Sequence, residues 1–162
     1  MNNKQTMNNK QTILAMHALF NPIHVGNVVL RAGTTDKLTI QAVNEEVLYR
    51  GPKNAGVYWY ETNTDIIKVG KVETKLATKK KDGTFGRGGS SGRLSGTFSD
   101  YSKKSTDERT KSHIHTAAIN NDCKVYFVPA KNITPKRLEH SIIVAFEWGA
   151  GYVKPRGNSK RA

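Results

Sequence analysis

The stretch AGVYWYETNTDIIKVGKV, residues 55 to 72, decides the fold of this chain. Val57 to Tyr60 and Ile66 to Val69 are rich in β-branched and aromatic residues, and the polar segment ETNTD joins them. This pattern predicts an antiparallel hairpin whose side chains alternate between two faces. Tyr58 and Tyr60 then share one face. A phenol and an ammonium therefore occupy inner positions of a strand pair that a hydrophobic core would fill with apolar residues.

Composition bounds the size and the partners of the protein. The chain has 162 residues, enough for one core and too few for two. Its 26 Lys and Arg against 13 Asp and Glu give a net charge of +13, which points first to a polyanion, with nucleic acid as the leading candidate. The sequence has no long apolar run and no signal-peptide pattern, so we expect no membrane span and a cytoplasmic location. The single cysteine, Cys123, argues against disulfides and a structural zinc site.

The N-terminal part of the chain predicts a small extension to the core. The hexapeptide MNNKQT occurs twice in residues 1–12, which are too polar to fold and are expected to form a disordered tail. Residues 13–50 then predict a helix and a β extension. Within them, ILAMHALF at 13–20 suits a short packed helix, and Val25 to Leu30 and Lys37 to Val43 have strand composition.

Residues 51–162 are expected to form the core. After the hairpin, residues 71–92 contain a KKK run and DGTFGRGGSSG, and this Gly and Ser content predicts a long, basic, mobile loop. A helix is expected over 106–120 and a strand over 123–128.

The last helix carries an anomaly. It is predicted within TPKRLEHSIIVAFE, residues 134–147, which opens with an N-cap threonine and a proline. Glu139, Ile142, Ile143 and Phe146 stand at i, i+3, i+4 and i+7, which puts a carboxylate at the head of the apolar stripe. Desolvation would penalise it unless it has a cation, a hydrogen-bonding partner or a water-filled cleft. The alternative is that Glu139 lies at the edge of the stripe, reaching solvent or a lysine.

Five motifs along the chain resemble those of the GIY-YIG nuclease superfamily, in the family's order. They are Gly56-Val57-Tyr58, Lys68-Val69-Gly70-Lys71, Gly92-Arg93-Leu94, Arg137-Leu138-Glu139 and Pro155-Arg156-Gly157-Asn158. The resemblance spans roughly residues 55 to 158. In addition, the segment from Thr110 to His115, followed by a strand, is similar to a helix and strand of small stand-alone phage and restriction members.

This resemblance implies an α+β fold with a three-stranded antiparallel sheet flanked by helices, and metal-dependent cleavage of a DNA phosphodiester. Tyr58 would deprotonate or orient the attacking water, and Arg93 would contact the scissile phosphate. Glu139 would be the sole protein carboxylate on one Mg²⁺, or another divalent ion such as Mn²⁺, per site. Lys68 replaces the second motif's tyrosine and is expected to assist Tyr58 or its water. Lys71 is a candidate phosphate ligand, although a surface lysine is an equal alternative.

The chemistry of these residue types agrees with such a reaction. A phosphoryl transition state gains negative charge, which a guanidinium and a metal ion stabilise. A single carboxylate suits Mg²⁺, because that ion keeps most of its waters and takes other ligands from the substrate. A phenol has a reference pKa of about 10, and neighbouring cations favour its ionised form.

Two departures from the family pattern leave alternatives open. The gap before Arg93 is longer than is usual in the family, and Arg87 is the competitor, although glycines surround it. Thr97 stands where the family often has a histidine, so Tyr101, His115 or no residue fills that role.

Further basic and polar side chains are candidates for DNA contact. Beside a glycine-rich loop in a chain of charge +13, they are expected to meet backbone phosphates, although lysine runs are also commonly solvated patches. The candidates are Lys79, Lys80, Lys81, Arg87, His115 and Asn158.

The leading functional hypothesis is therefore a Mg²⁺-dependent, site-specific double-strand DNA endonuclease resembling a type II restriction enzyme. A homodimer is expected, because cutting both strands of a symmetric site needs two active centres. The N-terminal extension and the basic loop would serve DNA binding or dimer contact. A phage-type degradative or homing nuclease is the alternative within this chemistry. A non-catalytic basic nucleic-acid-binding protein is the alternative from another class.

Overall fold

The computed structural model describes residues 9–35, 37–49, 55–81, 85–86, 93–94 and 108–149. Its elements in chain order are α2 (Asn9–Phe20), β1 (Ile23–Leu30), β2 (Leu38–Ala42), α3 (Glu45–Tyr49), β3 (Gly56–Glu61), β4 (Ile66–Val72), β5 (Thr78–Lys79), β6 (Phe85–Gly86), α5 (Glu108–Ile119), β7 (Lys124–Pro129) and α6 (Pro135–Gly149).

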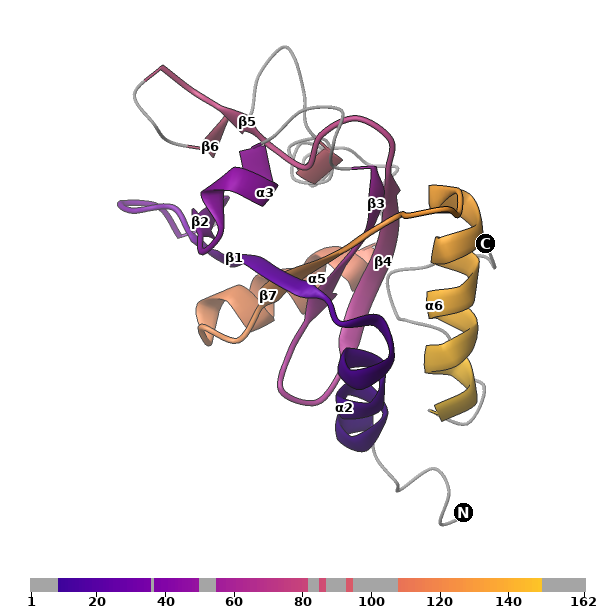
Figure 1. Ribbon diagram of the computed structural model, residues 1–162. Helices are drawn as coiled ribbons and strands as arrows, with labels where there is room; N and C mark the ends of the chain where they lie inside the picture. The colour runs from indigo at the N-terminus through magenta and orange to yellow at the C-terminus, as the bar shows by residue number, and fades with distance from the viewer. Residues whose placement is uncertain are drawn as a thin grey trace, which may run out of the picture.

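A five-stranded antiparallel sheet in the order β2-β1-β7-β3-β4 forms the centre of the molecule (Figure 1). The α+β class is confirmed, but the expected three-stranded sheet is wrong: β7, β3 and β4 form three adjacent strands, and β1 and β2 extend them. The physical reason is the free edge of β7. Its backbone groups would stay unpaired there, and β1 satisfies them by antiparallel pairing.

The predicted hairpin is present and supplies the interior strand β3 and the edge strand β4. Tyr58 lies opposite Gly70 and Trp59 opposite Val69, and a bulge follows Tyr60. Because successive side chains point to opposite faces, Tyr58 and Tyr60 join one apolar cluster while Trp59 and Val69 join another. All six residues of β3 are buried, so the hairpin lies between two cores.

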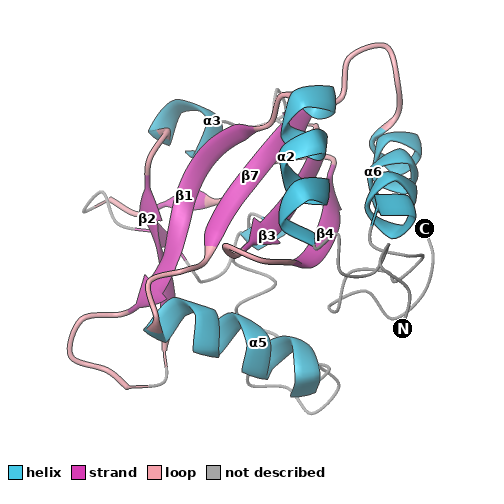
Figure 2. Cartoon of the chain, turned by 90° about the horizontal axis from the view of Figure 1, so that it is seen from below, coloured by secondary structure: helices cyan, strands magenta, loops and turns pink. Residues whose placement is uncertain are grey.

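Helices cover both faces of the sheet. On one face, α2 and α6 pack against each other, and α6 packs over β3 and β4, through residues such as Met16, Ile142 and Phe146. On the other face, α5 packs against β1 and β4, with Ile114 fully buried (Figure 2). None of the helices in the described ranges is long and apolar enough to cross a bilayer.

Several boundaries differ from the sequence-based expectation. Helix α2 begins at Asn9, inside the segment 1–12 that was expected to be a tail. The stretch expected as loop, 71–92, contains the end of β4 and the short pair β5 and β6. Leu76 is fully buried there, and the Ala77 amide donates to the Leu48 carbonyl at 3.1 Å. These contacts pack the segment after β4 against α3, a helix that the sequence did not predict. They explain why this segment is packed where the sequence predicted a mobile loop.

The last helix begins as predicted. The Arg137 amide donates to Thr134 Oγ1 at 3.2 Å, which identifies Thr134 as the N-cap residue. Ile142, Ile143 and Phe146 are buried against the sheet, as their spacing predicts.

Candidate active site at the β4 edge

The phenol of Tyr58 lies across the edge strand β4. Tyr58 is opposite Gly70 in register, and a β-carbon placed on Gly70 would stand 2.5 Å from both Oη and Cζ of Tyr58. No side chain fits there, so the glycine of the KVGK motif creates the passage that the tyrosine ring fills. Tyr58 is 0% exposed, and its ring meets that of Tyr60 edge-on at 5.7 Å.

Glu139 lies half-buried on the first turns of α6, where this helix packs on β3 and β4. Burial raises the pKa of Glu139 above its ordinary value, while the positive charges of Lys71, Arg93 and Lys68 act to lower it. The carboxylate at the head of the apolar stripe therefore has positively charged neighbours. A neighbouring cation is one of the features that can offset the desolvation of a buried carboxylate.

The backbone of Arg93 is held by the segment that follows β4, and the positive charge of Arg93 acts on Glu139. Its amide donates to the Lys75 carbonyl at 2.8 Å, and the Leu94 amide donates to Leu76 at 2.7 Å. Leu94 is fully buried, which anchors the turn, while the Arg93 residue is exposed. The competing Arg87 lies outside the described residues.

Lys68 and Lys71 approach from the two faces of β4. Lys68 is opposite Tyr60 and Lys71 is opposite Val57, so their side chains leave the strand in opposite directions. Lys71 leaves on the side that carries α6, as Val57 does, and Lys68 leaves on the side of Tyr60. The charges of both act on Glu139. Lys71 Nζ also lies 3.9 Å from the exposed carboxylate of Glu73, a weak pair.

The other predicted DNA contacts are not gathered here. Lys79 pairs with Glu45 on α3 at 3.3 Å, and its Nζ lies 5.6 Å from the centre of the Tyr49 ring. This lysine therefore joins β5 to α3. Lys80 and Lys81 are exposed on the loop that follows. His115 is half-buried on α5, and Asn158, Thr97 and Tyr101 lie outside the described residues.

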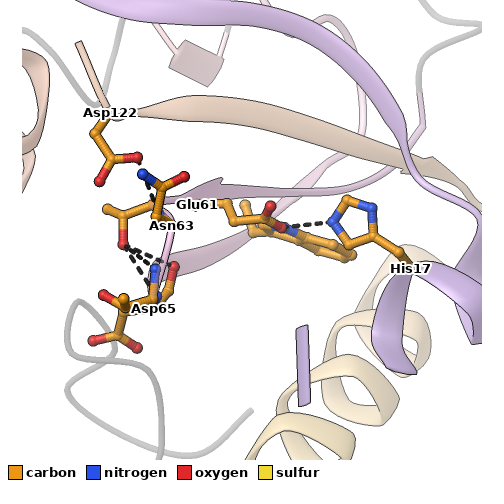
Figure 3. Close-up of polar contacts among 8 residues, drawn as sticks. His17, Glu61, Asn63, Asp65 and Asp122 are labelled. Carbon is orange, nitrogen blue, oxygen red and sulfur yellow. Dashed lines mark hydrogen bonds and ion pairs between the residues drawn. The ribbon is translucent and has the colours of Figure 1, made fainter. Parts of the chain in front are cut away.

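A second polar cluster, which the sequence did not predict, lies on the α2 side of the sheet (Figure 3). Trp59 Nε1 donates to Glu61 Oε1 at 3.0 Å, and His17 Nε2 lies 2.7 Å from the same oxygen. Sequence reasoning assigned Glu61 to the polar ETNTD turn, but β3 continues through it and leaves it only 8% exposed. The available signal was the spacing, since Trp59 and Glu61 are two apart and share a strand face.

Metal ligands are sparse in the described part of the chain. No group of three or more His, Cys, Asp or Glu side chains there could hold a metal ion. Glu139 is thus a lone carboxylate among cations, not part of an acidic cluster. Comparisons with family models, with curated proteins and with solved structures gave no match.

Proposed function

We propose that this chain is a metal-dependent DNA endonuclease of the GIY-YIG type. The observation that carries the proposal is the electrostatic environment of Glu139. Lys71, Arg93 and Lys68, which come from β4 and from a distant turn, all act on one half-buried carboxylate at the β4 edge. The Tyr58 phenol lies across the same strand at Gly70.

The charges suit a phosphodiester. Three cations beside Glu139 and the weakly paired Glu73 leave an excess of positive charge at the β4 edge, in a chain that carries +13 in total. Such a site attracts a phosphate group and stabilises the additional negative charge of a phosphoryl transition state. Arginine presents two parallel donors to phosphate oxygens, so Arg93 is assigned to the scissile phosphate.

The donor set fits Mg²⁺ held by one protein ligand. Mg²⁺ is commonly bound through one or two carboxylates, waters and substrate phosphates, and Glu139 supplies one carboxylate. Because Lys71, Arg93 and Lys68 repel a cation, we expect tight binding only when a DNA phosphate is present to offset their charge. When bound, the ion would act as a Lewis acid and help to generate the nucleophile.

The remaining roles follow the family resemblance. Tyr58 would orient the attacking water or take its proton, and Lys68 would assist Tyr58 or its water. Tyr58 is 0% exposed in the free protein, so this role requires its hydroxyl to become accessible when DNA binds. For the biological activity we propose site-specific double-strand cleavage by a homodimer on DNA, with a degradative or homing role as the alternative.

A plasmid digest tests the proposal. Supercoiled plasmid is incubated with the protein in Mg²⁺, in Mn²⁺, in Ca²⁺ and in EDTA, beside the variants Glu139→Gln and Glu46→Gln. Glu46 is an exposed carboxylate on α3 and serves as the matched control. We expect nicked and linear DNA with Mg²⁺ or Mn²⁺, and a loss of at least about 10²-fold in rate for Glu139→Gln alone.

The outcomes separate the competing functions. Discrete fragments favour site-specific cleavage, and a smear favours degradation. If the wild-type protein binds DNA but leaves it intact in both metals, the nuclease proposal fails and the chain is a non-catalytic nucleic-acid-binding protein.

A further inference from the structure

On one side of the sheet, no helix in the described part of the chain packs over β1 and β2. On the side that carries α2 and α6, these helices pack over β3 and β4 and bury Trp59, Val69 and Ile142. Figure 2 shows β1 and β7 beside α2, with their broad faces in view. The side chains that β1 and β2 direct to this side, and Lys124 of β7, are exposed or partly exposed, whereas Tyr126 packs against His17 and Val128 is buried.

The strand register identifies those side chains. Asn27 lies opposite both Gln41 and Lys124, which gives a row across β2, β1 and β7. His24 lies opposite Tyr126, and Val29 opposite Thr39. We call this set the open face: His24, Asn27, Val29, Thr39, Gln41, Lys124 and Tyr126. Neighbouring residues in the same strands point the other way and are buried in the opposite core, among them Val28, Ile40, Val125 and Phe127.

The open face is polar and free of carboxylates. The sequences of β1, β2 and β7 contain no Asp or Glu. Gln41 and Lys124 are exposed, and Asn27 and Thr39 are partly exposed. A stable protein partner would favour a more apolar centre. Glu61 of β3 lies opposite Lys124, but it is only 8% exposed and is held by Trp59 and His17. The exposed amide, hydroxyl and ammonium groups, in a chain of charge +13, complement a polyanion instead.

We propose that the open face is the surface that reads the base sequence of duplex DNA. The β1–β2 ribbon would enter the major groove, as two-stranded ribbons can. The amides of Gln41 and Asn27 suit bidentate contact with adenine, and Lys124 suits a phosphate or a guanine edge. This inference rests on the proposed function for its choice of duplex DNA as partner.

Tyr126 argues against single-stranded nucleic acid as the occupant. Binding of single strands relies on bases stacking on free aromatic rings. His24 already stacks on Tyr126, with ring centres 5.1 Å apart and planes at 29°. His17 meets the same ring at 4.6 Å and 77°. The ring is thus packed between two histidines, while the amides beyond it stay accessible.

The open face is separate from the β4 edge. β7, the strand of the open face nearest to β4, is two strand spacings from it, about 10 Å at about 4.8 Å each, and β1 is three spacings away. Substitutions on the open face therefore leave Glu139 and its cations in place. Sequence preference and cleavage chemistry can be measured independently.

The test is selection of bound sequences from a pool of short randomised DNA duplexes, in Ca²⁺ so that binding is measured without cleavage. We expect the wild-type protein to enrich a motif. Gln41→Ala and Asn27→Ala should each reduce the preference for the selected base at one position of the motif, by on the order of 10-fold. Lys124→Ala should either do the same or weaken all sequences together. The matched control is Asn120→Ala, an exposed amide at the end of α5.

An unchanged motif and affinity in both amide variants would overturn the inference, as would wild-type protein that prefers single strands or shows no duplex binding. Asn27 Oδ1 is held by His24 Nε2 at 3.0 Å, so thermal melting must first show that Asn27→Ala is folded. If it is not, Gln41→Ala carries the test, because Gln41 is exposed. Cleavage is not read in this assay, so a failed plasmid digest refutes the nuclease proposal without deciding this one.

Discussion

The ring of Tyr58 occupies the space that a side chain at residue 70 would need, because a β-carbon on Gly70 would lie 2.5 Å from the tyrosine hydroxyl. Real β-carbons do not approach other atoms so closely, so the two residues depend on each other. The glycine holds no special backbone angle here. Its role is to let a phenol from the interior strand β3 reach over the edge strand β4.

Gly70→Ala should therefore displace the Tyr58 ring. We expect a loss of stability of about 1–3 kcal/mol from overpacking and a large loss of cleavage rate. Tyr58→Phe is the companion variant, since it keeps the ring and removes the hydroxyl. It should melt close to the wild-type temperature and still lose cleavage. Urea denaturation with plasmid nicking checks both, and a fully active, fully stable Gly70→Ala protein would contradict the observed packing.

The hairpin and the last helix were predictable because their patterns are local. Two alternating runs joined by a polar turn define β3 and β4, and an N-cap threonine followed by an apolar stripe defines α6. The same periodicity correctly placed Tyr58 and Tyr60 on one face of β3. It also identified Glu139 as a carboxylate that needs a cation, a hydrogen-bonding partner or a water-filled cleft, and three cations act on it.

Other features depend on contacts between distant residues, which a local pattern does not contain. The pairing of β1 with β7 follows from the free edge of β7. The Arg93 backbone pairs with Lys75, a residue far from it in the sequence, and the charge of Arg93 acts on Glu139. The sequence pattern placed Glu61 in the ETNTD turn, but β3 continues past Tyr60 through a bulge and includes Glu61.

Lys71→Met and Lys68→Met should both slow cleavage, because each removes a positive charge that acts on Glu139. Without that charge the pKa of Glu139 rises further, so the acidic limb of the pH–rate profile should move to higher pH. The shift should be larger for Lys71, whose effect on Glu139 is the stronger one. Lys10→Met, an exposed lysine on α2, is the control. A Lys68→Met protein with the full wild-type rate would refute a role for Lys68.

Glu61→Ala should destabilise the protein by about 1–3 kcal/mol, because it leaves the buried indole N–H of Trp59 without its acceptor. It also removes the contact that holds His17, and with it α2, to the hairpin. Glu61→Gln keeps an acceptor oxygen and should cost less. Urea denaturation followed by tryptophan fluorescence measures the difference, and equal losses in the two variants would argue against the hydrogen bond.

Cys123 should be inert to thiol reagents in the folded protein. It is 2% exposed at the start of β7, and burial raises the pKa of its thiol to about 12. Almost no thiolate therefore exists at neutral or mildly alkaline pH, and the thiolate is the reactive form. Ellman's reagent should label the protein rapidly in guanidinium and only at the rate of unfolding in buffer. Rapid labelling of the native protein would contradict the burial of this strand.

Glu139→Gln should abolish cleavage and yet slightly stabilise the fold at neutral pH. The folded-state pKa of Glu139 lies above its ordinary value of 4.5 because burial outweighs the neighbouring cations. Between these two values the folded state keeps a proton that the unfolded state has lost. Stability therefore falls as the pH rises through this window, and the ionised carboxylate is a net cost above it.

The gain from Glu139→Gln should stay below about 1 kcal/mol, because the side chain is only half-buried and solvent screens its charge. It should shrink as the pH falls below 4.5, where the wild-type carboxyl is protonated in both states. Urea denaturation at neutral pH and near pH 4 measures the two values, with Glu46→Gln as the exposed control. A Glu139→Gln protein that is less stable at neutral pH would mean that the attraction of Lys71, Arg93 and Lys68 exceeds the desolvation penalty. Glu139 would then contribute to stability, and its position would need no functional explanation.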